Sequence, residues 1–62
     1  MNEQPHIETA YAVTVATLFN TFLTSFVTAR GNATAEAAAE REFREKIVRA
    51  RHARDRAIAV LP

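Results

Sequence analysis

The chain has 62 residues, 8 basic and 7 acidic, and its formal net charge of +1 excludes a polycation that overall charge would steer to nucleic acid. It contains no Cys, which excludes disulfides and thiolate metal sites. We expect a single domain, 1–62, whose core supplies only about 3–5 kcal/mol, so association with another chain is the common way to stabilise it.

The first predicted element is a helix from about residue 5 to residue 30, after a loose lead-in at 1–6. Residues 9–29 carry no charge, and at 100° per residue their large apolar side chains other than Val13 share one arc about 180° wide. The β-branched residues favour a strand, but Leu18 and Phe19 are adjacent, which breaks an alternation of period two. We therefore predict a helix, since packing overrides propensity. Pro5 suits its first turn, where the missing N–H needs no partner.

Two features of helix 5–30 are unusual. Its apolar arc is wider than the stripe of about 100° that one neighbouring helix covers. Its opposite side is a polar but uncharged ridge of Thr14, Thr17, Thr21, Thr24 and Thr28. Such a ridge is compatible with water, with another helix or with a bilayer.

A turn at 31–34 and a second helix from about residue 35 to residue 60 follow. Gly31 suits the left-handed position after a helix, and Asn32 or Thr34 can cap the next one. So short a turn makes the two helices antiparallel neighbours. Helix 35–60 has one narrow apolar stripe, typical of a bundle helix, and acid–base pairs four residues apart at Glu40–Arg44, Glu42–Lys46 and Glu45–Arg49.

These elements predict an all-α fold, a two-helix antiparallel hairpin. Helix 35–60 can cover only one side of the wide arc on helix 5–30. We therefore expect a homodimer that forms a four-helix bundle, with helix 5–30 at its centre.

The apolar surfaces of both helices are the candidate interface and partner-binding site. Its predicted residues are Tyr11, Val15, Leu18, Phe19, Phe22, Leu23, Phe26, Phe43, Ile47 and Arg54. Arg54 falls inside the apolar stripe. We interpret it as an arginine whose stem packs while its head stays in water, with an ion pair to a Glu of a second chain as the alternative.

No spacing of residues indicates catalysis or a cofactor. His52 and Asp55 stand three apart, which is a weak metal pattern, and we expect no metal site. The sequence predicts a non-enzymatic protein–protein interaction module. The Arg- and Ala-rich composition is typical of a GC-rich genome, so we expect a cytoplasmic bacterial or phage regulator that binds and inhibits a target protein.

Three alternatives remain open. A DNA-binding dimer would use the Arg-rich second half of helix 35–60, and its affinity would fall steeply with salt. A single-span membrane protein would use residues 9–29, which have the length of a span. A structural assembly subunit would form bundles larger than a dimer and need no separate partner.

Overall fold

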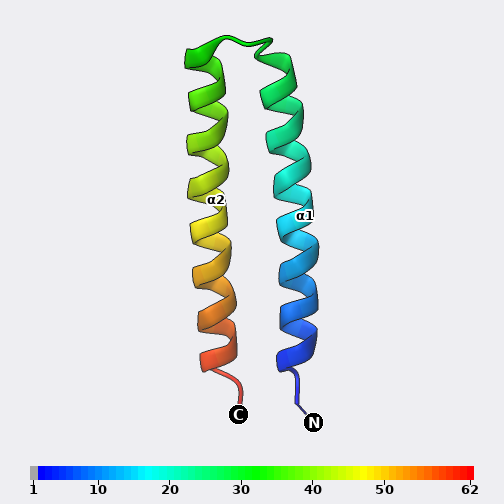
Figure 1. Ribbon diagram of the computed structural model, residues 1–62. Coiled ribbons are helices and arrows are strands. Elements are labelled where there is room, and N and C mark those ends of the chain that lie inside the picture. Colours follow the sequence, from blue (N-terminus) through cyan, green and yellow to red (C-terminus); the bar gives the residue numbers. More distant parts are fainter. Residues whose placement is uncertain (1) are drawn as a thin grey trace.

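The computed structural model describes residues 2–62 and is built from two helices, α1 (Gln4–Thr28) and α2 (Ala33–Ala59). The helices run antiparallel, side by side along their whole length, and both chain termini lie at the same end (Figure 1). The predicted all-α antiparallel hairpin is confirmed. Helix α1 begins at Gln4, inside the expected lead-in, whose first residue, Met1, lies outside the described residues.

The turn lies two residues earlier than predicted, at 29–32. The reason is the backbone of Arg30, which we expected to be helical: it takes a left-handed φ of 51°, and Gly31 follows with a φ of 79°. Two successive left-handed residues reverse the chain and end α1 at Thr28. The Asn32 side chain then accepts a hydrogen bond of 2.9 Å from the backbone N–H of Ala35, which confirms the predicted cap of α2.

The helices meet along one seam of half-buried side chains. Helix α1 contributes Ile7, Tyr11, Val15, Leu18, Phe22 and Phe26, the turn contributes Ala29, and α2 contributes Glu36, Ala39, Phe43, Ile47, Ala50, Arg54, Ala57 and Ile58. Within residues 2–62 only Ala39 reaches the level of a buried residue, with 7% of its surface exposed. Each helix therefore has a neighbour on one side only.

The hairpin is a thin slab with more surface than a compact protein of its mass. Its Cα atoms span 49 × 15 × 7 Å with a radius of gyration of 14.7 Å, against about 10.5 Å for a compact chain of this length. Its accessible surface is 4883 Å², whereas a compact monomer of 6.9 kDa exposes about 4000 Å². The excess, about 900 Å², comes from leaving most of each helix uncovered.

Candidate functional site

Exposed apolar side chains form a stripe along α1, next to the seam. We call it the outer stripe, and its residues are Ala12, Ala16, Phe19, Leu23 and Val27. Phe19 is 48% exposed, Leu23 45% and Val27 65%. Spacings of three and four residues place all five on one side of the helix. Helix α1 thus has two adjacent apolar stripes, as a helix with two neighbours in a bundle would.

An aromatic cluster joins the seam to the outer stripe. The ring centroid of Phe22 lies 5.1 Å from that of Phe43 on α2 and 5.5 Å from that of Phe26. Phe19 lies 6.4 Å from Phe22 on the other side. Tilted rings at these distances attract one another beyond their area of burial. The exposed ring of Phe19 is therefore held in place by Phe22, which in turn packs against Phe26 and Phe43.

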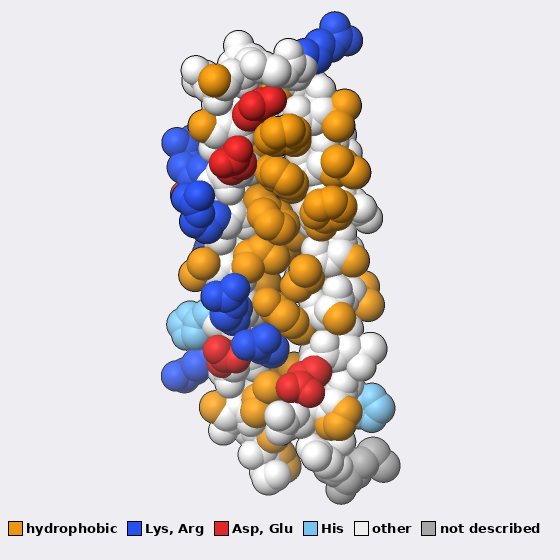
Figure 2. All heavy atoms as spheres, viewed as in Figure 1, with side chains coloured by type: hydrophobic (Ala, Val, Ile, Leu, Met, Phe, Trp, Pro, Cys, Tyr) orange, Lys and Arg blue, Asp and Glu red, His pale blue; other side chains and the backbone are white. Residues whose placement is uncertain are grey.

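An open groove runs beside this cluster, lined by Phe22, Glu40, Phe43, Arg44 and Ile47. Its floor is apolar, and Glu40 and Arg44 stand on the α2 side. Figure 2 shows this face: apolar side chains follow the seam and continue over α1. The groove and the outer stripe thus form one continuous apolar face.

Oppositely charged residues beside this face lie toward opposite ends of α2. Glu36 and Glu40 lie on α2 near the turn, Arg51 and Arg54 lie toward the chain ends, and Arg44 stands between them. Figure 2 shows acidic side chains next to the apolar ones near the turn and, farther down, basic side chains with acidic ones beside them. Helix α1 has an acidic residue near its start, Glu8, while Arg30 follows its other end.

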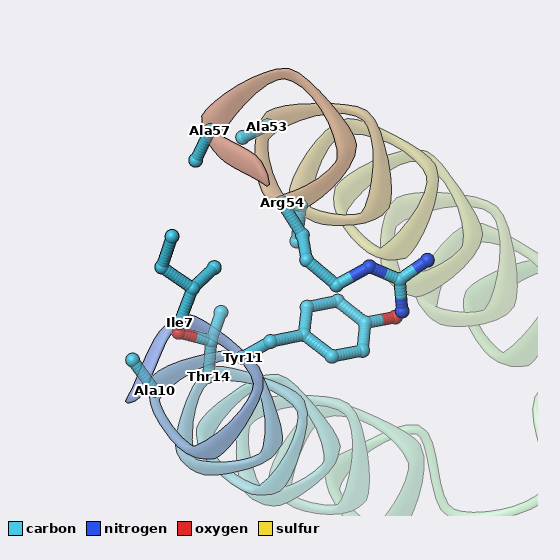
Figure 3. Close-up of a pocket in the computed structure, with 8 residues that line it drawn as sticks. Ile7, Ala10, Tyr11, Thr14, Ala53, Arg54 and Ala57 are labelled. Atoms are coloured by element: carbon cyan, nitrogen blue, oxygen red, sulfur yellow. The ribbon is translucent and has the colours of Figure 1, made fainter. Parts of the chain in front are cut away.

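Arg54 packs over an aromatic ring at the open end of the hairpin. Its Cζ atom lies 4.5 Å from the centroid of the Tyr11 ring, within the range of a cation–π contact. Its Nε and Nη2 atoms donate hydrogen bonds of 3.0 and 2.9 Å to Oδ1 of Asp55. Figure 3 shows the Arg54 side chain reaching from α2 to Tyr11 on α1, beside a hollow lined by small residues such as Ala10, Ala53 and Ala57. The guanidinium therefore has partners within its own chain.

We predict that Arg54 and Tyr11 are energetically coupled. In a double-mutant cycle of Arg54→Leu and Tyr11→Leu, followed by urea unfolding, we expect a coupling of about 0.5–1 kcal/mol. The matched control replaces Arg54 by its exposed neighbour Arg51 in the same cycle, and there the two effects should add. Additivity at Arg54 as well would mean that the ring contact contributes nothing.

The predicted interface residues divide into two groups. Phe19 and Leu23 lie on the exposed outer stripe. The other eight are half-buried in the seam: Tyr11, Val15, Leu18, Phe22, Phe26, Phe43, Ile47 and Arg54. Two residues beyond the predicted set matter here. Val27 continues the outer stripe, and its spacing from Leu23 already indicated this. Asp55, noted only for its weak metal spacing from His52, accepts hydrogen bonds from Arg54.

No other constellation in the described chain gathers reactive groups. Among residues 2–62 no group of three His, Asp or Glu side chains could hold a metal ion. The α2 arginines do not share one side: at 100° per residue, Arg44 and Arg51 project toward the apolar face, and Arg49 and Arg56 project away from it. An extended basic strip, as a DNA backbone would require, is not formed by these side chains.

Three of the five hydroxyl groups on the threonine ridge of α1 are engaged within the helix. Those of Thr17, Thr21 and Thr24 donate hydrogen bonds of 3.1–3.2 Å to the carbonyl oxygens four residues earlier. Thr9 does the same to Pro5 at 2.9 Å. The ridge therefore presents mainly methyl groups, without unpaired hydroxyl donors at these positions.

Comparison with known proteins adds no relative: no protein-family model matches the chain, and neither a curated protein nor a solved structure is significantly similar to it.

Proposed function

We propose that this protein is a non-enzymatic association module, which acts by burying the outer stripe of α1 against another protein chain. The observation that carries the proposal is the run of exposed Phe19, Leu23 and Val27 beside an aromatic cluster. Large aromatic and aliphatic side chains on a rigid base are typical anchors of helix-packing interfaces. In a cytoplasmic bacterial or phage setting, such a module would regulate its target by occupying a helical surface.

The size of the hairpin supports the same proposal. A chain that buries so little of itself has a small reserve of stability. Covering the outer stripe would add the second neighbour that α1 lacks. The expected state in solution is a homodimer or a complex with a target, and a free single hairpin would be marginal.

The experiment is the mass of the purified, detergent-free protein by light scattering across a dilution series. We expect a mass above that of one chain, or a poorly folded single chain that folds when a target is added. A well-folded single chain with a sharp unfolding transition would contradict the proposal, because the stripe would then need no partner.

A second candidate, a membrane-associated protein, is favoured by the length and composition of α1. This helix is long and apolar enough to cross a membrane, and none of that segment is buried in the hairpin. The threonine hydroxyls that bond to their own backbone would be tolerated in a bilayer. Against it, α2 packs along all of α1 and is charged throughout, so the hairpin would have to open before α1 could insert.

Flotation with lipid vesicles separates the two candidates. The association module should stay with the soluble fraction at all lipid concentrations. The membrane protein should float with neutral vesicles and require detergent for extraction.

A further inference from the structure

We propose that the chain covering the outer stripe is a second copy of this protein, stacked face to face and antiparallel, with its two-fold axis at the level of Phe19 and Asn20. The inference rests on the proposed function, because it names the occupant of the same surface. Two independent features of the hairpin converge on this one axis: the stripe itself and the charges on α2.

The contacts between the helices set a common scale of height. Phe22 packs on Phe43, and Arg54 lies over Tyr11. Residue i of α1 therefore lies level with residue 65 − i of α2. The proposed two-fold axis is perpendicular to the helices and parallel to the face of the slab, so it places α1 on α1 and α2 on α2, each pair antiparallel. A residue a given distance above the axis in one copy therefore faces the residue that lies the same distance below the axis in its own chain, contributed by the other copy.

The outer stripe is self-complementary about the proposed axis. Ala12 and Val27 lie at equal distances from the midpoint between residues 19 and 20, and so do Ala16 and Leu23. In the antiparallel pair each large side chain would therefore face an alanine of the other copy. Alternation of large and small residues across facing positions is the arrangement that lets helices pack closely. The two Phe19 side chains would meet beside the axis.

The charges on α2 have the same centre. Glu40 and Arg51 are centred at the level of residues 45 and 46, which lies opposite residues 19 and 20 of α1. Each lies about 8 Å from the axis along the helix, at 1.5 Å per residue. Glu40 of one copy would thus meet Arg51 of the other, twice in each dimer.

A further pair on α2 agrees with this centre to within about one residue rise of 1.5 Å. Glu36 and Arg54 are centred at residue 45. Arg54 keeps its partners Tyr11 and Asp55 within the chain, so Glu36 would add to that network. One register therefore places Glu40 opposite Arg51 and Glu36 opposite Arg54 of the other copy.

A parallel stack would not use these features. With the two-fold axis along the helices, α2 of one copy would lie over the uncharged α1 of the other. Glu40 and Arg51 would then face the apolar side chains of the outer stripe, and burying charges without partners is costly. The antiparallel stack buries the outer stripe of one copy against the outer stripe of the other.

The area available agrees with a dimer. The hairpin exposes about 900 Å² more than a compact monomer of its mass. A stable interface takes about 800 Å² from each partner. Covering one face by a second copy would bring the chain to the surface expected of a compact protein.

The test is a charge exchange between Glu40→Arg and Arg51→Glu, two exposed positions. Each variant alone places like charges opposite each other twice, and its self-association at about 50 mM salt should weaken about tenfold. An equal mixture restores both opposite-charge pairs, so a heterodimer of wild-type affinity should form. The control, Arg49→Glu, makes the same charge change on the outward side of α2 and should leave the dimer unchanged. Circular dichroism checks that each variant remains helical.

Preferential heterodimers in the mixture would support the antiparallel register. If the wild type dimerises but neither variant weakens it and the mixture shows no preference, the register is wrong, while the proposed association through the stripe stands. If the wild type remains a single chain at every concentration, a second copy is not the occupant. The proposed function itself fails only if that single chain is also well folded.

Discussion

Replacing Phe22 by Asp is expected to unfold the hairpin. The Phe22 ring contacts three other phenylalanine rings, including Phe43 across the seam. Truncating a core Phe costs about 3–5 kcal/mol, toward the lower end for a half-buried ring, and the new carboxylate would lie in the seam without a partner. A core of this size supplies only about 3–5 kcal/mol in total. Circular dichroism should show loss of most helical signal at 25 °C.

Val13→Asp is the matched control for that experiment. Val13 also lies on α1 but is 63% exposed, so its replacement places the same charge in water and should change the free energy of unfolding by less than about 0.5 kcal/mol. A Phe22→Asp protein that stays helical and keeps its mass by light scattering would contradict the aromatic cluster as the centre of the fold.

The double variant Phe19→Asp/Leu23→Asp is expected to separate association from folding. Both side chains are about half exposed in the single hairpin, so their removal should leave the seam between the helices in place. Two carboxylates on the outer stripe would have to be buried without partners in any complex, which should weaken association by at least about 100-fold. The measurement is the mass by light scattering, beside circular dichroism at high protein concentration.

Thr17→Asp/Thr24→Asp serves as the control, because it adds the same two charges at exposed positions of the threonine ridge, away from both the outer stripe and the seam. Its mass should equal that of the wild type. An unchanged mass in the Phe19→Asp/Leu23→Asp protein would show that the outer stripe is not the contact surface.

The sequence predicted the helices and their pairing because these depend on local signals. The spacing of the apolar residues in α1 fits the period of a helix and not that of a strand. Gly31 and Asn32 are turn residues with defined roles. It did not predict the position of the turn, since a left-handed Arg30 has no signature in its residue type. Of the three predicted acid–base pairs, Glu42–Lys46 forms an ion pair, with 3.2 Å between Nζ of Lys46 and Oε1 of Glu42.

The division of the apolar arc could not be read from the sequence. Phe19 and Phe22 have the same residue type and lie only about 60° apart within the predicted arc. Yet Phe22 is half-buried against Phe43 of α2, whereas Phe19 is 48% exposed. The angle at which α2 approaches decides which of them faces the seam, and that angle depends on the packing of all side chains together. The Arg54–Tyr11 contact was missed for the same reason, because it joins residues 43 positions apart.

The most direct test of the central claim, that α1 is completed by another chain on its outer stripe, is the concentration dependence of thermal unfolding. Followed by circular dichroism over about a 100-fold range of protein concentration, the Tm should rise with concentration, because association stabilises only the folded hairpin. In the Phe19→Asp/Leu23→Asp protein the Tm should be lower and independent of concentration. A wild-type Tm that does not change over this range, with a mass of one chain throughout, would contradict the claim.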